Sequence, residues 1–91
     1  MKIKWTGHAE ERQREWEKKL GITREEIEDL VMNPEQIVPG DRDALIAQNR
    51  RSRGLLRVPF IEGEGERKIL PAYWTSRVER YWKGEGDADS I

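Results

Sequence analysis

Two short connections that contain glycine do most to limit how this chain can fold. They span residues 50–54 and 62–66, and they separate three apolar stretches with the alternation typical of strands, at residues 43–49, 55–61 and 67–74. Connections of this length join strands that run in opposite directions. The sequence therefore predicts an antiparallel meander of three strands in the second half of the chain.

Side-chain alternation predicts which residues of this meander are buried. Leu56, Val58 and Phe60 share one face of the second strand, because successive side chains of a strand point to opposite faces. Two sets of residues on the first strand fit beside that face equally well. They are Leu45 with Ala47, and Ala44 with Ile46.

Two prolines fall inside the predicted strands. Proline has no backbone N–H to donate to a neighbouring strand, so within sheets it is confined to edges, strand starts and bulges. We therefore expect Pro59 and Pro71 to mark an edge position, a bulge or the true end of a strand.

A strand and a helix are expected before the meander. Residues 2–5 have the alternation of a short strand, and Thr6 is a suitable N-cap for the helix that follows. That helix is predicted over residues 7–20, with one apolar stripe and charged residues elsewhere. Gly21 is the expected end, because glycine readily adopts the left-handed conformation of a helix C-terminus.

The second helix has the most complete start signal in the sequence. Thr23 and Glu26 form a capping box, while Ile22 and Ile27 stand at the two positions of a hydrophobic staple. An Asn-Pro pair follows Met32 and cannot continue a helix. The sequence therefore predicts a short second helix that ends near Met32.

The third strand leads into a segment rich in aromatic and cationic side chains, Ile69–Trp82. Ser76 and Glu79 have the S-x-x-E spacing of a helix start, so we expect Ser76 to cap a short final helix. Side chains three and four positions apart then lie on one helical face. That face carries two cations and a phenol, from Arg77, Arg80 and Tyr81.

The order of these elements predicts an α+β fold. A strand and two helices precede the antiparallel meander and the final helix, which places the helices on one face of a curved sheet. A chain of 91 residues has room for a single domain, expected at residues 1–83. Residues 84–91 carry three acids and little that can be buried, so we expect an acidic, disordered tail.

Composition argues against several kinds of site. The chain has no cysteine and one histidine, so we expect no disulfide, no metal site and no cofactor. No apolar run has the length of a membrane span, and the first residues lack the apolar core of a signal peptide, which indicates a cytoplasmic protein without membrane contact. The net charge is −1, but three of the 18 acidic residues follow position 83, so the rest of the chain carries 17 basic and 15 acidic residues. A local basic surface is compatible with this balance.

Five short motifs, taken in their order and spacing, resemble a known family. They are His8-x-x-x-Arg12, Gly21-Ile-Thr-x-Glu-Glu-Ile27, Asn33-Pro34-Glu35, Gly54-Leu-Leu-Arg-Val58 and Tyr73-x-Thr-Ser-Arg-x-x-Arg-Tyr81. Together they resemble the BrnT-like branch of the RelE-type toxin superfamily, and most closely a small family of RelE-like domains that carries the His-x-x-x-Arg motif. Pro59 and Pro71 depart from that family, which has β-branched strand residues there.

The resemblance implies an endoribonuclease that cuts RNA, often messenger RNA, without a metal ion and that an antitoxin protein holds inactive. Such cleavage needs a base for the 2′-hydroxyl proton, cations for the charged transition state and an acid for the leaving oxygen. Histidine is the side chain that titrates near neutral pH, which makes His8 the candidate acid or base. The candidate catalytic residues are His8, Arg12, Arg77, Arg80 and Tyr81.

RNA binding requires cations for the phosphates and aromatic faces on which unstacked bases can lie. A cluster of arginines in the middle of the chain and one tyrosine of the meander have these properties. The candidate RNA-binding residues are Arg50, Arg51, Arg53, Arg57 and Tyr73.

Structural roles account for several of the same residues. A histidine in the first turn of a helix commonly caps or packs, and Arg12 is placed for a salt bridge to Glu15. The arginines of residues 50–53 stand at a hairpin tip, where charge keeps a turn solvated. Three functions therefore stay open: an endoribonuclease, an RNA-binding module that does not cleave, and a protein-interaction domain on the same fold.

The expected partners follow from these functions. RNA is expected for the first two, and the resemblance implies a cognate antitoxin protein. An exposed strand edge of the meander would accept either an antitoxin segment or a second copy of this chain as a homodimer.

Overall fold

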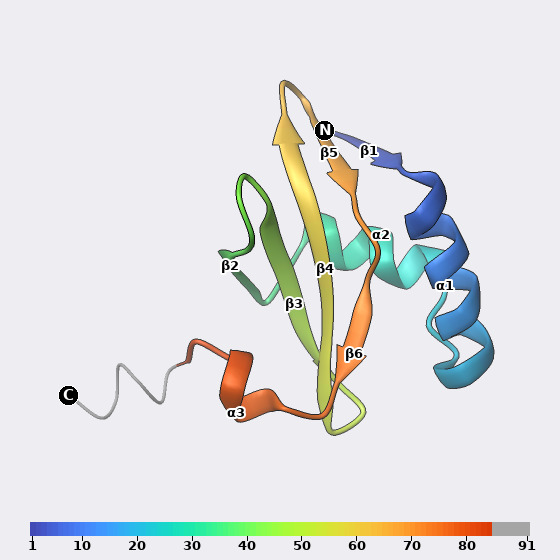
Figure 1. Cartoon of the computed structure of the whole chain (residues 1–91), viewed down its shortest axis with the longest axis vertical. Coiled ribbons are helices and arrows are strands. Elements are labelled where there is room, and N and C mark those ends of the chain that lie inside the picture. Colours follow the sequence, from blue (N-terminus) through green and yellow to red (C-terminus); the bar gives the residue numbers. More distant parts are fainter. Residues whose placement is uncertain (85–91) are drawn as a thin grey trace.

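The strand, the helices and the meander expected from the sequence are present in the computed structural model, which describes residues 1–84 (Figure 1). Within that range the elements are β1 (Lys2–Trp5), α1 (Gly7–Leu20), α2 (Arg24–Met32), β2 (Gln36–Pro39), β3 (Leu45–Arg51), β4 (Gly54–Gly63), β5 (Glu66–Ile69), β6 (Tyr73–Thr75) and α3 (Val78–Tyr81). The α+β class is thereby confirmed. Apart from Gly84, the predicted acidic tail lies outside the described residues.

The six strands form one open sheet, in which five follow the order β1-β5-β4-β3-β2 (Figure 1). β5 pairs with residues 60–63 of β4, and β6 pairs with residues 55–57 along the same edge of β4. The strands of the meander are antiparallel, as predicted. β1 is the exception, because it runs parallel to β5 with Lys2 opposite Glu66 and Trp5 opposite Ile69. The position of β1 in the sheet therefore depends on β5, which comes more than 60 residues later in the chain.

The prediction of one continuous third strand at residues 67–74 is wrong, because this segment forms two strands, β5 and β6. Pro71 lies in the break between them. The carbonyl of Pro59 accepts a hydrogen bond of 2.9 Å from the N–H of Leu70, which also lies in the break. In a strand the N–H and C=O of one residue point to the same side, so the donor that Pro59 lacks faces the interruption. Each proline thus occupies a place where no ladder bond is required.

The predicted N-caps Thr6 and Thr23 and the predicted C-cap Gly21 are confirmed, and the boundaries of α1 match the expected residues. The capping box is confirmed only in its Thr23 half, because the carboxylate of Glu26 accepts from Arg51. The hydroxyl of Thr6 accepts from the N–H of Ala9 and donates to the carbonyl of Ile69, so the cap also ties α1 to β5. Gly21 ends α1 with a φ of 71°. Thr23 accepts a hydrogen bond of 3.1 Å from the N–H of Glu26 at the start of α2.

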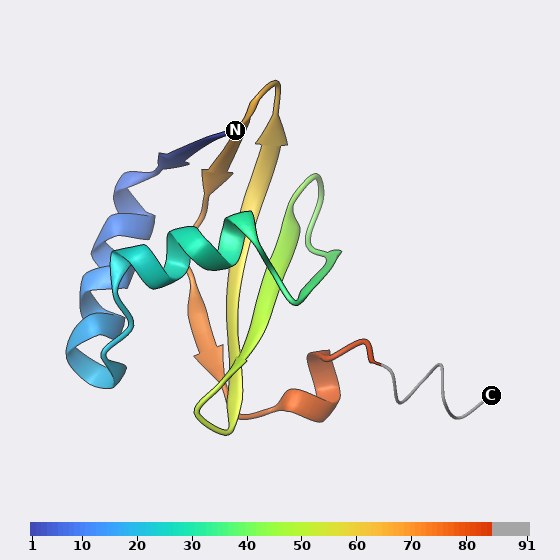
Figure 2. The same ribbon diagram turned by 180° about the vertical axis from the view of Figure 1, so that it is seen from behind.

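The core lies between α2 and one face of the sheet. In Figure 2, α2 crosses in front of the strands, and α1 lies beside it. Of the two sets left open on β3, the structure has Leu45 and Ala47 opposite Phe60 and Val58 on the core face. The fully buried side chains each contribute about 1.5–3 kcal/mol. They include Ile22, Ile27, Leu56, Val58, Phe60 and Ile69.

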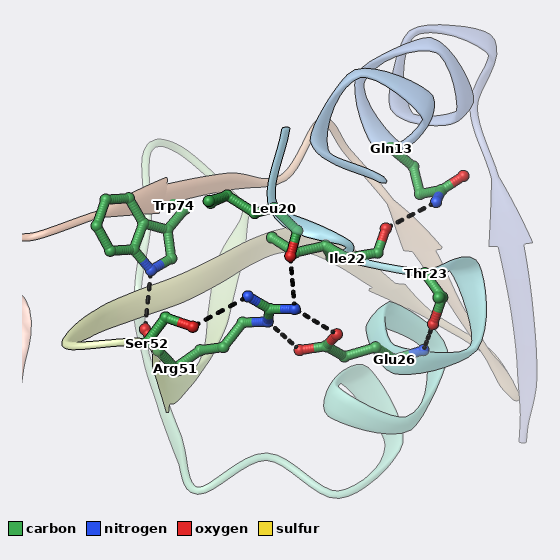
Figure 3. Close-up of polar contacts among 8 residues, drawn as sticks. All are labelled: Gln13, Leu20, Ile22, Thr23, Glu26, Arg51, Ser52 and Trp74. Carbon is green, nitrogen blue, oxygen red and sulfur yellow. Dashed lines mark hydrogen bonds and ion pairs between the residues drawn. The ribbon is translucent and has the colours of Figure 1, made fainter. Parts of the chain in front are cut away.

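Arg51 holds the helices to the tip of the β3–β4 hairpin (Figure 3). Its guanidinium donates to both carboxylate oxygens of Glu26, at 2.6 and 3.3 Å, and to the carbonyl of Leu20 at 3.0 Å. The carbonyl of Arg51 itself accepts a hydrogen bond of 2.8 Å from the indole of Trp74. We call this group, made of Arg51, Glu26 and the Leu20 carbonyl, the Arg51 cluster.

The predicted start of the final helix is wrong. The hydroxyl of Thr75 accepts from the N–H of Arg77, and the carbonyl of Ser76 accepts from the N–H of Val78. These two bonds turn the chain once more before the helix begins, so α3 starts at Val78 and Arg77 stands at its N-cap without a side-chain cap bond. None of the helices within residues 1–84 is long and apolar enough to cross a membrane.

Candidate nucleic-acid interface

A row of polar side chains crosses the face of the sheet that points away from α2. Leu56 and Val58 of β4 belong to the core, so Arg57 between them points to the opposite face. The strand register then sets Gln48 of β3 on one side of Arg57 and Tyr73 of β6 on the other.

Arg57 is the centre of this row, and only 5% of it is exposed. Its Nε donates to the amide oxygen of Gln48 at 2.7 Å, and its Nη1 donates to the hydroxyl of Tyr73. The guanidinium carbon also lies 4.0 Å from the centre of the Tyr81 ring, a cation–π contact. Arg57 is therefore held in a fixed orientation by two hydrogen bonds and an aromatic face.

Two glutamines orient these groups and fasten the segment after α3 to the sheet. Gln48 is fully buried, and its amide nitrogen donates to Gln36 at 2.8 Å and to the carbonyl of Tyr81 at 3.0 Å. The amide oxygen of Gln36 also accepts a bond from the N–H of Lys83. Because its amide nitrogen is used in this way, the oxygen of Gln48 faces Arg57.

The charge of Arg57 has no acidic partner within residues 1–84. The ion pairs of that range join other residues, and none includes Arg57. A buried cation normally has a carboxylate beside it, because removing a charge from water is costly. Arg57 has neutral amide, phenol and ring partners in its place, and no ion pair within residues 1–84 compensates its positive charge.

An open pocket of about 510 Å³ lies over Arg57. Side chains of the sheet form its floor, and α3 and Lys83 form one wall. The prediction that the helices share one face of the sheet is therefore wrong for α3, which lies on the face away from α2 and accepts a hydrogen bond there from Gln48 at the carbonyl of Tyr81. The charged and aromatic residues that line the pocket are Asp41, Arg57, Tyr73, Arg80, Tyr81 and Lys83. We call this the basic-aromatic pocket, since it combines three cations and two phenols with one carboxylate.

The five predicted catalytic residues do not meet at one place. Arg80 and Tyr81 line the basic-aromatic pocket, and Arg77 lines a shallow neighbouring pocket together with Arg80. His8 and Arg12 lie on α1 and line neither of these pockets. The His8 side chain is 90% exposed with its Nδ1 3.6 Å from Glu11, and Arg12 makes the salt bridge to Glu15, at 3.3 Å.

The predicted RNA-binding residues also separate into groups. Arg57 and Tyr73 are in the basic-aromatic pocket. Arg50 is exposed at the hairpin, with its guanidinium carbon 4.7 Å from the Trp82 ring centre, and Arg53 is exposed in the turn with a φ of 64°. Arg51 is the exception, because its guanidinium is occupied by the Arg51 cluster.

Sequence reasoning missed Gln36, Gln48, Asp41 and Lys83 as parts of the site. Gln48 had one usable signal, since it is a polar residue in an apolar strand and alternates with residues of the core face. The contribution of the other three depends on strand register and on the path of the chain after α3, and no local pattern predicts either.

The site offers cations and phenols as its chemical groups. Among residues 1–84, no group of three or more His, Cys, Asp or Glu side chains is placed to hold a metal ion. The described part of the chain thus defines a small α+β domain with an open six-stranded sheet and a basic-aromatic pocket on the sheet face away from α2. Comparison with protein-family models, with curated proteins and with solved structures finds no match.

Proposed function

We propose that this protein binds single-stranded RNA, with a phosphate at Arg57 and a base against the tyrosines of the basic-aromatic pocket. The observation that carries the proposal is the state of Arg57: a nearly buried cation, fixed between Gln48 and Tyr73, without a carboxylate partner within residues 1–84. A phosphodiester would supply the missing negative charge. An arginine oriented in advance loses little entropy when it binds one.

The groups around Arg57 fit the other needs of a single strand. Arg80 and Lys83 are exposed on the wall of the pocket and are positioned to contact phosphate oxygens. Tyr73 and Tyr81 are half-buried, and each offers an aromatic face for an unstacked base. Stacking of a base on an aromatic side chain contributes about 1–3 kcal/mol and accepts any base.

Further cations extend the surface beyond the pocket. Arg77 adjoins Arg80 across α3, and Val78 of the same helix lines a pocket with Arg50 and Arg53 of the hairpin. A strand that leaves the basic-aromatic pocket over α3 would reach these arginines in turn. Several phosphate contacts then act together, which makes the affinity depend steeply on salt concentration.

Binding is measured by fluorescence anisotropy of a labelled single-stranded oligoribonucleotide. We expect Arg80→Ala and Lys83→Ala each to weaken binding and to reduce the slope of log affinity against log salt by about 1. Arg12→Ala is the matched control, since Arg12 is an exposed arginine on α1, and it should leave the affinity unchanged. If both pocket variants bind as tightly as the wild type, or the wild type does not bind, the proposal is wrong.

A second candidate is cleavage of the bound RNA, as in the RelE and BrnT-like toxins that the motifs resemble. Arg57 and Arg80 would stabilise a pentacoordinate phosphate, and the hydroxyls of Tyr73 and Tyr81 and the amine of Lys83 are the pocket's groups for proton transfer. His8 and Arg12 have no part in this scheme, because they lie on α1. An antitoxin-like protein and a second copy of the chain are the partners proposed with it.

Cleavage is tested separately, with RNA incubated in EDTA and analysed on a denaturing gel. The scheme predicts products that end in a 2′,3′-cyclic phosphate, and it predicts loss of activity in Tyr81→Phe with binding retained. His8→Ala should remain as active as the wild type. RNA that binds at the pocket yet stays intact at high protein concentration would remove the cleavage candidate and leave the binding proposal in place.

A further inference from the structure

A second pocket, of about 480 Å³, adjoins the basic-aromatic pocket on the same face of the sheet. Tyr73, Ile46 and Asp41 line both, so the two pockets are continuous. The walls of the second pocket are mostly apolar, from Pro59 and Ile61 of β4 and from the segment that interrupts the third strand. We call it the apolar pocket.

Two carboxylates stand at the rim of the apolar pocket, in the turn between β2 and β3. Asp41 and Asp43 both line it. The turn is fixed by hydrogen bonds of 2.9 Å from the N–H of Gly40 to the carbonyl of Ala44 and of 3.0 Å from the N–H of Ala44 to the carbonyl of Asp41. No ion pair or side-chain hydrogen bond within residues 1–84 occupies either carboxylate. Their oxygens are therefore available as acceptors.

The contrast between the two pockets sets the direction of a bound nucleotide. Arg57, Arg80 and Lys83 line the basic-aromatic pocket with Asp41 as its one carboxylate, whereas the apolar pocket has Arg42 between Asp41 and Asp43. A phosphate is therefore attracted more strongly to the basic-aromatic pocket. A base is uncharged and flat, and it gains from apolar walls and from the Tyr73 ring that the two pockets share. The base next to the bound phosphate thus fits the apolar pocket, with its polar edge at the rim.

The rim favours one base over the others. Guanine presents two adjacent donors on its pairing edge, N1–H and the N2 amino group, and a carboxylate can accept both at once. Adenine and cytosine present one amino group beside a ring acceptor, and uracil presents one N–H between two carbonyls. A carboxylate opposite any of these three gains at most one hydrogen bond and faces a repelled lone pair.

We propose that the apolar pocket is a guanine-binding subsite, in which Asp41 or Asp43 accepts hydrogen bonds from the pairing edge of a guanine next to the bound phosphate. This inference rests on the proposed RNA binding and adds its sequence preference.

The test uses short oligouridine RNAs that carry a single central guanine, inosine, adenine or uracil. We expect guanine to bind about tenfold more tightly than adenine, which is the discrimination of one bidentate contact. Inosine lacks only the N2 amino group and should fall between them. Asp41→Asn and Asp43→Asn are then measured, and one of them should reduce the preference for guanine over adenine by about tenfold.

Glu64→Gln is the matched control, since Glu64 is an exposed acid in the turn between β4 and β5, and it should keep the preference for guanine. RNA that binds with Arg80-dependent affinity but without distinction among the four bases would overturn the guanine subsite and leave the proposed function standing. A loss of affinity for all four RNAs alike in both aspartate variants would also overturn it. Failure of the wild type to bind any of the RNAs would overturn both proposals.

Discussion

Replacement of Arg51 by methionine separates stability from binding on the β3–β4 hairpin. The side chain of Arg51 is 79% covered and donates four hydrogen bonds, two to Glu26, one to the carbonyl of Leu20 and one to the hydroxyl of Ser52. Methionine keeps most of the apolar stem and removes all of the donors. The loss leaves a carboxylate and a carbonyl without their partner at the joint between the helices and the sheet.

The expected cost follows from these contacts. Hydrogen bonds to a charged group contribute about 1.5–3 kcal/mol, and the partial exposure of Glu26 favours the lower end of that range. The bond to the Leu20 carbonyl adds about 1 kcal/mol. We therefore expect Arg51→Met to lower the free energy of unfolding by about 2–3 kcal/mol, which lowers Tm on the order of 10–20 °C in a domain of this size.

Urea denaturation followed by tryptophan fluorescence measures this change. Arg50→Met is the matched control on the same strand, because Arg50 is exposed and has only its contact with Trp82 to lose, about 0.5–1 kcal/mol. A double-mutant cycle with Glu26→Gln should give a coupling free energy of at least about 0.5 kcal/mol.

The two substitutions should have the reverse order of effect on RNA binding. We expect Arg50→Met to weaken binding and Arg51→Met, measured below its melting temperature, to leave it unchanged. The reasoning is refuted if Arg51→Met unfolds at the same urea concentration as the wild type and binds RNA less tightly, since Arg51 would then be a nucleic-acid contact and its cluster would contribute nothing to stability.

Two further substitutions test how the sheet is held. A Cβ at Gly54 would lie 2.3 Å from the carbonyl of Thr75 and 2.5 Å from the Trp74 ring, so Gly54→Ala should lower the free energy of unfolding by about 3 kcal/mol in urea titration. Gly7→Ala, where nothing lies within 4 Å, should not destabilise. Thr6→Ala should lower the free energy of unfolding by about 2 kcal/mol, because it removes both the α1 cap and the bond to Ile69. Thr6→Ser keeps the hydroxyl and should keep most of this stability, so equal melting temperatures of the two variants would argue against the cap.

The helices were predictable because their signals are local. Thr6, Gly21 and Thr23 each act on backbone groups within a few residues, so the sequence pattern includes both partners of every cap. The final helix shows the limit of such signals. The S-x-x-E pattern at Ser76 is present, but Thr75 one residue earlier accepts the N–H of Arg77 and delays the helix.

The sheet was predictable in direction but not in detail. Hairpin connections fixed the antiparallel order, while the division of the third strand depends on Pro59 of one strand facing the segment around Pro71 of another. Proline reasoning correctly marked both positions as exceptional. It did not reveal that Pro59 faces the segment that contains Pro71, because this depends on the register between the two strands.

Residue type alone predicted several members of the candidate site, but it could not predict which of the candidates the fold brings together. Arg57, Tyr73, Arg80 and Tyr81 were selected by residue type, and the fold brings them into one pocket. His8 was selected in the same way, yet α1 carries it away from that pocket. Which elements share a face of the sheet depends on long-range pairing, and a single sequence gives no direct measure of it.

The parallel pairing of β1 with β5 has a consequence for synthesis. The cap residue Thr6 bonds to Ile69, 63 positions later, and Trp16 bonds to the carbonyl of Ala72, 56 positions later. At about 5–20 residues per second, a ribosome needs on the order of 3–13 s to add the intervening residues. During that interval the first strand and helix have emerged without the strand against which they dock. Their apolar side chains, Ile3, Trp5 and Trp16, then lack the core against which they pack, and slowing translation should increase the yield lost to aggregation before β5 emerges.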